Sequence, residues 1–278
     1  LREHNLMRST KRKVDGTDSL LILENSALSL LKTNHSIQDA SACDLSPAGI
    51  VVHTGDFKVD YTPVFGDAID LQRFAEIGKK GVLALMSDST NAERAGFTQS
   101  ERTVGRTFDH LFAEHSNTRI IIATFASNGI GAADINSAYK YGRKAVVEGR
   151  SMVNIISTAA ELGYLDIPKN TLIEIDKLKN YPPEKTVLIT TGSQGESMAA
   201  LSRMAADIHK KVTIMPGDTL FQFQPIPGNE KSVSKVINEL SAKGANVIFQ
   251  DAHVSGHACQ EELKLIYSLV KPKYAIPV

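Results

Sequence analysis

Short apolar runs alternate with amphipathic segments along most of the chain. The apolar runs end in Gly or Ser, as strands that lead into loops do, and they cover residues 49–55, 81–89, 119–127, 141–149, 186–195, 211–217 and 246–256. Helical spacing of apolar positions predicts helices over 70–80, 100–115, 197–211, 233–245 and 260–273. Strands that each lead into a helix predict an α/β architecture, with a mostly parallel sheet in the later part of the chain.

Small polar residues follow several of these predicted strands. Open α/β sheets bind ligands where strands end, and the first N–H groups of a following helix favour an anion. Two interpretations stay open: a phosphate pocket shared by several loops, or ordinary helix caps, which use the same residue types. The side chains that would contact a nucleotide phosphate are Ser127, Asn128, Ser151 and Ser193, and Arg150 would pair with the phosphate or with a carboxylate.

Each of two apolar runs is followed by a residue of a type that can bind a metal ion. His35 follows the run 21–34, and Asp56 follows the run 48–55. A neutral imidazole and a carboxylate that can bridge two cations are what a two-metal hydrolase needs. A lone His is more often a core residue, so this interpretation depends on the accompanying motifs. His53 lies inside its strand and is interpreted as structural, and solvent exposure is expected for three helix histidines, His110, His115 and His209.

Composition limits the classes of protein that fit. The 278 residues allow one large domain or two medium ones. Only two cysteines are present, Cys43 and Cys259, which excludes a disulfide framework and favours a reducing cytoplasm. No apolar run reaches the length of about 18 residues that a membrane span needs. The net charge of +0 argues weakly against RNA binding, although a local basic groove needs no overall excess.

Eight motifs in order carry a family resemblance. They read TNHSIQDA, HTGDFKVDYTP, SDSTNAERAGFT, TFASN, GRSM, TTGSQGE, PIPGNEKSV and HVSGHACQEELK. Their order and wording resemble bacterial ribonuclease J, a β-CASP member of the metallo-β-lactamase superfamily. The resemblance implies a partial metallo-β-lactamase-like αββα core over 1–100, an inserted β-CASP domain over 101–248, and a return to the core over 249–278.

The resemblance also implies roles for individual residues. His35 would be a metal ligand, and Asp56 would bridge two divalent ions, zinc or manganese. Asp88 would orient a ligand histidine, although a turn or helix-cap role fits it equally. His257 would stabilise the transition state or protonate the leaving oxygen.

The remaining HVSGHA residues would lie beside the scissile phosphate. These are His253, Ser255 and Gly256, whose donors would contact the RNA, and a structural loop is the alternative. The implied activity is metal-dependent hydrolysis of single-stranded RNA from a 5′-monophosphate end, in cytoplasmic RNA processing and decay. Internal cleavage is left open, and the family forms homodimers or tetramers.

Departures from the family pattern bear on whether this chain is active. The metal motif HxHxDH is absent from residues 1–278, so these residues alone should neither hold a metal pair tightly nor cleave RNA. After TFASN, a His-Arg pair is replaced, and Gly129 and Gly131 weaken the helix start. Phe221 and Phe223 replace a more polar run. The replaced pair favours the main alternative, an inactive RNA-binding or scaffold paralogue. A hydrolase of small esters is a weaker alternative, because the motif series resembles the branch that acts on nucleic acids.

Overall fold

The computed structural model describes residues 20–23, 26–35, 41–46, 48–63, 67–124, 130–163, 165–223, 225, 228–250 and 255–278. The strands are β1 (Leu20–Leu23), β2 (Ser26–Lys32), β3 (Ser41–Ser46), β4 (Gly49–His53), β5 (Val82–Ser87), β6 (Ile120–Ala123), β7 (Lys144–Glu148), β8 (Thr186–Thr190), β9 (Thr219–Phe223), β10 (Asn246–Gln250) and β11 (Tyr274–Pro277). The α-helices are α1 (Leu71–Lys80), α2 (Glu101–Glu114), α3 (Ile130–Lys140), α4 (Arg150–Glu161), α5 (Ala200–Ala205), α6 (Glu230–Ala242) and α7 (Gln260–Val270). Two 3₁₀ helices follow α4, η1 (Ile175–Asn180) and η2 (Pro183–Lys185). The α/β class predicted from the sequence is confirmed.

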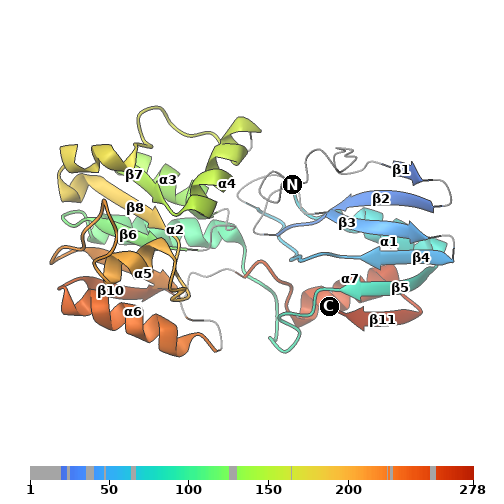
Figure 1. Cartoon of the computed structure of the whole chain (residues 1–278). Helices are drawn as coiled ribbons and strands as arrows, with labels where there is room; N and C mark the ends of the chain where they lie inside the picture. The colour runs from blue at the N-terminus through green and yellow to red at the C-terminus, as the bar shows by residue number, and fades with distance from the viewer. Residues whose placement is uncertain are drawn as a thin grey trace.

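The strands form two sheets that lie in separate lobes (Figure 1). The first has the order β1-β2-β3-β4-β5-β11 and is antiparallel from β1 to β4, then parallel from β4 to β11. Helices α1 and α7 pack against it, with Phe74, Ile77 and Ile266 in the same buried cluster as Leu31 and Leu85 of the sheet. This sheet therefore combines an early part of the chain with its last strand.

The second sheet has the order β10-β9-β6-β8-β7, and every printed pairing in it is parallel. Strand β6 is central and fully buried along IIIA, because both of its faces are covered. Ile120 and Ile122 belong to one core cluster, whereas Ile121 and Ala123 belong to the other. Side chains of successive strand residues point to opposite faces, so the lobe has a helix–sheet–helix arrangement of three layers.

Different helices cover the two faces of this sheet. Phe108 of α2, Ile135 of α3 and Met152 of α4 join the cluster on one face. Leu201 of α5 and Val236 of α6 join the cluster on the other. The predicted parallel sheet in the later part of the chain is therefore confirmed.

Several local predictions need correction. The segment 211–217 forms no strand; Val212 and Ile214 are buried without ladder pairing, and a turn follows before β9 begins at Thr219. The helix predicted over 197–211 spans only Ala200–Ala205, because the chain turns into the left-handed region at Asp207 (φ 57°). Helix α3 begins at Ile130 despite the neighbouring glycines.

The first sheet has one edge at which several strands end. Strands β4, β5 and β11 are parallel, and β2 runs in the same direction because two antiparallel pairings separate it from β4. Asn34 and His35 follow β2, Asp56 follows β4, and Asp88 follows β5. The topology therefore brings these side chains to a single edge.

Candidate functional site

Asp56, Asp88 and His257 meet at this edge. One ligand atom from each lies within 4.8 Å of those of the other two, so the three could hold a metal ion. Asp56 is exposed, Asp88 is buried and His257 is partly buried. His35 belongs to the same place, because its Nε2 lies 3.6 Å from Asp56 Oδ2 and its ring contacts the His257 ring at a centroid distance of 5.3 Å.

The pairing of His257 with Asp88 fixes one imidazole. His257 Nδ1 lies 2.8 Å from Asp88 Oδ2, and a carboxylate can only accept, so Nδ1 carries the proton. Burial acts to raise the pKa of Asp88, but hydrogen bonds from His257 and Thr90 outweigh it, and this pKa lies below its ordinary value. The bond to Asp88 raises the pKa of His257, against the opposing effect of its partial burial.

Asp88 also closes a turn. Its Oδ1 accepts the Thr90 N–H at 3.0 Å, and its own N–H is donated to Thr54 Oγ1 at 3.0 Å. The two roles considered from the sequence, a turn residue and a partner for a histidine, therefore both describe its contacts. Because the turn fixes the carboxylate, Oδ2 is held toward His257.

The ring of His35 is oriented in a similar way. Its Nδ1 lies 2.9 Å from the carbonyl oxygen of Gly256, which can only accept, so Nδ1 carries the proton. In a neutral ring Nε2 then keeps its lone pair, on the side of Asp56. A histidine whose other nitrogen donates to a carbonyl is the usual form of a metal ligand.

The loop that carries His257 is held by residues that the sequence analysis missed. Asn91 Nδ2 donates to Ser255 Oγ at 2.7 Å and to the His257 carbonyl at 3.1 Å. Thr98 Oγ1 donates to the same carbonyl at 2.7 Å. Ser255 Oγ also accepts the His257 N–H at 3.1 Å. Asn91 and Thr98 lie inside the SDSTNAERAGFT motif, but nothing in a single sequence shows that this motif meets HVSGHA.

A buried carboxylate joins three chain segments beneath the site. Glu262 is 0% exposed and accepts the N–H groups of Val59 at 2.7 Å, Thr98 at 2.7 Å and Cys259 at 2.8 Å. Val59 lies three residues after Asp56 in the same motif, and Cys259 lies two residues after His257. The sequence signal was present, because Glu three positions after a helix N-cap is half of a capping box.

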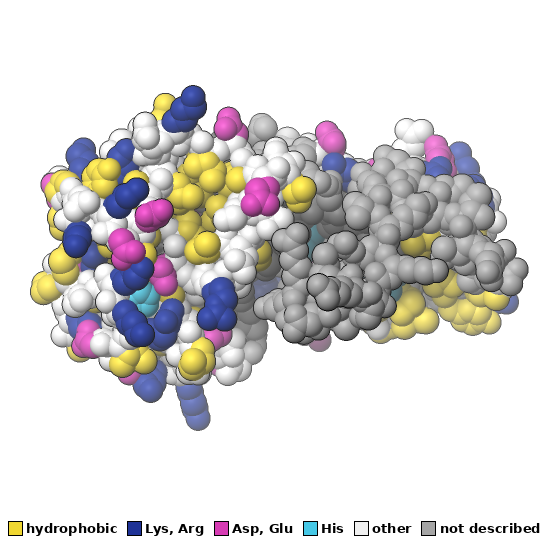
Figure 2. All heavy atoms as spheres, turned by 45° about the horizontal axis from the view of Figure 1, so that its top comes forward, with side chains coloured by type: hydrophobic (Ala, Val, Ile, Leu, Met, Phe, Trp, Pro, Cys, Tyr) yellow, Lys and Arg dark blue, Asp and Glu magenta, His cyan; other side chains and the backbone are white. Residues whose placement is uncertain are grey.

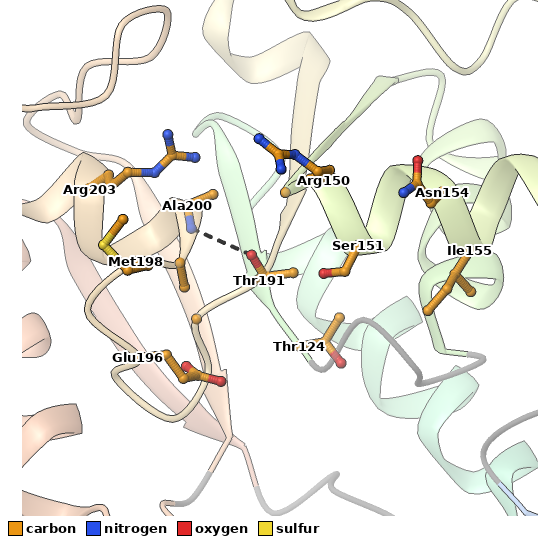
Figure 3. A pocket seen from close by; sticks show the side chains of 13 residues that line it. Thr124, Arg150, Ser151, Asn154, Ile155, Thr191, Glu196, Met198, Ala200 and Arg203 are labelled. Atoms are coloured by element: carbon orange, nitrogen blue, oxygen red, sulfur yellow. Dashed lines mark hydrogen bonds between the residues drawn. The ribbon is translucent and has the colours of Figure 1, made fainter. Parts of the chain in front are cut away.

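A second feature lies in the other lobe, where loops after β6, β7 and β8 surround a cavity of about 750 Å³. Figure 3 shows Arg150 and Ser151 at the first turn of α4, facing Arg203 and Met198 on the α5 side. Of the predicted phosphate contacts, Ser151 lines this cavity. Ser193 is 0% exposed and is not among the lining residues.

The interpretation of a phosphate pocket shared by several loops stays a prediction. The HVSGHA loop contributes to the site on the first sheet, where Ser255 and Gly256 contact Asn91 and His35. Ser127, Asn128 and His253 lie outside the described residues.

Two of the histidines expected in solvent are packed against other side chains. The His209 side chain is 4% exposed, and its Nε2 lies 3.1 Å from Glu148 Oε1. The His115 ring packs against Phe221 at a centroid distance of 5.8 Å. Phe221 is itself buried in the core. His110 has a 73% exposed side chain, as expected, and His53 accepts the Gly55 N–H at 2.9 Å, a local structural contact.

Comparison with known proteins finds relatives of this chain. Residues 117–240 match the family model described as "Ribonuclease J, beta-CASP domain". Ribonuclease J 1 of Streptococcus pyogenes is 46% identical over 284 residues, which cover 100% of this chain and 50% of that protein. The chain is homologous to ribonuclease J. Ribonuclease J2 of Bacillus subtilis is 42% identical over 100% of the chain and 51% of its own length. Ribonuclease J of Thermus thermophilus is 41% identical over 96% of the chain and 47% of its own length.

The chain thus spans about half the length of these ribonuclease J relatives, or less. A solved structure from Enterococcus faecalis, titled as a protein of unknown function, matches 98% of the chain and 63% of its own at a TM-score of 0.63 and 16% identity. That likeness supports the fold alone. Within the described residues, no helix is both long and apolar enough to cross a membrane.

Proposed function

We propose that the protein containing this chain is a metal-dependent ribonuclease that degrades single-stranded RNA from its 5′ end, in RNA processing and decay. The observation that carries the proposal is the convergence of Asp56, Asp88 and His257, with ligand atoms within 4.8 Å of one another, in a homologue of ribonuclease J. Phosphodiester hydrolysis needs a nucleophile and groups that neutralise charge on the phosphorus, and this edge of the sheet presents side chains of that kind.

The donors at this edge fit divalent metal ions. His35 offers a free Nε2 and Asp56 an exposed carboxylate, a nitrogen and oxygen set that suits zinc or manganese. We propose that both residues would be ligands and that the Asp56 carboxylate would be shared by two ions. The metal pair, when bound, supplies an activated water and offsets negative charge on the scissile phosphate.

His257 and Asp88 act together in this proposal. Asp88 holds the proton on Nδ1 and aligns the ring. The raised pKa of His257 favours a second proton on Nε2, which the ring would give to the leaving oxygen or use to stabilise charge on the phosphorane. Asp88 therefore acts through His257 as a positioning residue.

Beside the scissile phosphate, Ser255 would offer its hydroxyl and Gly256 its backbone, and His253 is proposed to contribute there. Contacts to a nucleotide phosphate are proposed for Ser127, Asn128, Ser151 and Ser193. We propose a preference for RNA with a 5′-monophosphate end.

The distribution of charge gives no separate support for RNA binding. Figure 2 shows basic and acidic side chains interspersed over the β-CASP lobe on the face in view, in keeping with the net charge of +0.

We further propose the division 1–100, 101–248 and 249–278 into core, β-CASP domain and return to the core. A cytoplasmic homodimer or tetramer is the proposed form of the full-length protein.

The test uses the full-length protein and labelled single-stranded RNA with a 5′-monophosphate, 5′-triphosphate or 5′-hydroxyl end. We expect the monophosphate substrate to be degraded fastest, with activity lost in EDTA and restored by zinc or manganese. His257→Ala should lower kcat by about 10²–10⁴-fold, the usual contribution of a general acid. His110→Ala, at an exposed position on α2, is the matched control and should keep full activity.

Each contrary result has a defined meaning. RNA binding without turnover in any metal would replace the proposal with the inactive paralogue. Equal rates on all three ends would remove the 5′-phosphate preference. Hydrolysis of thioesters or β-lactams without action on RNA would favour a small-ester hydrolase.

A further inference from the structure

Asn34 is a buried residue that joins the segments of the two proposed metal ligands. It directly precedes His35 and is 7% exposed. Its backbone carbonyl oxygen accepts the Lys58 N–H at 2.8 Å, and the two residues form an isolated antiparallel bridge. Lys58 lies two residues after Asp56. The backbone of Asn34 therefore connects the end of β2 to the segment that carries Asp56.

The side chain of Asn34 makes further contacts with the same segment. Its Oδ1 accepts the Ile69 N–H at 2.8 Å and the Asp60 N–H at 3.4 Å. Its Nδ2 donates to the Asp67 carbonyl oxygen at 2.8 Å. Two N–H donors at one atom and a carbonyl oxygen at the other decide which way the amide points. One side chain thus holds two separate parts of the segment that follows Asp56.

The two proposed ligands restrain one another only weakly. Asp56 has a 61% exposed side chain, and its Oδ2 lies 3.6 Å from His35 Nε2, which is beyond hydrogen-bond distance. The other ring nitrogen of His35 donates to the Gly256 carbonyl oxygen, in a third segment. The separation of His35 and Asp56 is therefore set by the segments that carry them, and Asn34 joins these two segments directly.

We propose that Asn34 is a positioning residue of the metal site, which holds His35 and Asp56 at a separation that suits a metal ion before the ion binds. The inference rests on the proposed function, because it concerns the same site. A set of ligands that is already arranged loses less conformational freedom on binding, so its affinity is higher. Residues that orient metal ligands contribute about 10–100-fold to metal affinity, and we expect a contribution of that size from Asn34.

The test is a titration of the metal-free full-length protein with zinc and with manganese, in competition with a chelator and without RNA. Asn34→Ala removes every side-chain contact of the amide and should weaken metal binding by at least about tenfold. Asn34→Ser keeps a hydroxyl that can accept one of the two N–H groups, so its loss of affinity should be smaller than that of Asn34→Ala. Excess metal should restore much of the rate of RNA hydrolysis in both variants, because the defect is one of metal affinity.

Asp70→Ala is the matched control for a loss of stability near the site. Asp70 caps α1 by accepting the Arg73 N–H at 2.9 Å, and it directly follows Ile69, which Asn34 contacts. Loss of a helix cap destabilises a protein, but the contacts between Asn34 and the Asp56 segment are kept. We therefore expect Asp70→Ala to unfold at a lower urea concentration and to bind metal with wild-type affinity.

Wild-type metal affinity in the Asn34 variants would overturn the inference and leave the proposed function standing. If Asn34→Ala does not fold, Asn34→Ser alone decides between the two results. An equal loss of affinity in Asp70→Ala would also overturn the inference, because a general loss of stability would then explain the effect. Absence of metal binding by the wild-type protein at millimolar concentration would overturn the proposed metal dependence, and this inference with it.

Discussion

The carboxylate of Glu262 gives the sharpest prediction about how the site is held. It accepts N–H groups from Val59, Thr98 and Cys259, which belong to three segments that are distant in sequence. Hydrogen bonds to a charged group contribute about 1.5–3 kcal/mol each, and an unpaired buried donor costs about 1–3 kcal/mol. Removing the side chain in Glu262→Ala should therefore lower the free energy of unfolding by an amount comparable with the whole stability of a domain, about 5–15 kcal/mol.

Glu262→Gln is the more informative variant. Its amide oxygen can take the place of Oε2 and keep the Thr98 and Cys259 N–H groups, while the amide nitrogen then faces the Val59 N–H. One donor is unpaired and two bonds lose their charge assistance, so we expect a loss of about 2–4 kcal/mol. Glu261→Gln is the matched control, because Glu261 is a partly exposed neighbour whose bond to Lys264 is a surface pair.

Urea unfolding of the full-length variants measures the total change, and hydrogen exchange by mass spectrometry locates it. Exchange should accelerate in peptides around Val59, Thr98 and Cys259 together, because one group serves all three. The kcat of the proposed ribonuclease activity should fall as well, since Cys259 and Thr98 both fix the segment that carries His257. The reasoning is refuted if the free energies of unfolding of Glu262→Gln and Glu261→Gln differ by less than about 0.5 kcal/mol. It is also refuted if the exchange rate changes in only one of the three peptides.

Three further predictions concern stability. Asp134 is fully buried without a partner in the described structure, and burial raises its pKa well above the ordinary value. Folding therefore favours the protonated form of Asp134, so its contribution to stability declines as the pH rises above the pKa of the unfolded state. The variant Asp134→Asn should raise the free energy of unfolding by at least about 1 kcal/mol at pH 8. Urea unfolding should show a smaller increase at pH 5. A Cβ at Gly78 would lie 2.0 Å from the Leu269 carbonyl oxygen, so Gly78→Ala should lower Tm by separating α1 from α7, at a cost of about 1–3 kcal/mol or more; an unchanged Tm would contradict the close approach. Arg119 and Asp218 form a buried pair with two contacts between their side chains, so Arg119→Met should cost about 3–5 kcal/mol, whereas the double variant with Asp218→Leu should lie nearer the wild type; equal losses would count against the pair.

The repetition of apolar runs and amphipathic helices was enough to predict the α/β class. This pattern gave a wrong prediction of a strand where apolar side chains are buried but the backbone does not pair with another strand. Val212 and Ile214 are as apolar as strand residues, yet they fill the core from an irregular segment. Burial satisfies the apolar pattern, and only backbone partners decide whether a strand forms.

His209 shows the same limit for polar residues. Its place in a predicted helix suggested solvent exposure, but the helix ends at Ala205 and the ring contacts Glu148 at the end of β7. The partner is 61 positions away in sequence, and no local pattern encodes it.

The sequence by itself determined which residues have the chemistry to bind a metal ion or transfer a proton. The ligand-type residues His35, Asp56, Asp88 and His257 stand at the ends of apolar runs and within motifs, and these are local properties of the chain. What only the tertiary structure decided is which of them meet. Parallel strands carry Asp56 and Asp88 to one edge, and Glu262 joins the segments around them, because long-range hydrogen bonds and burial select one arrangement that residue order leaves open.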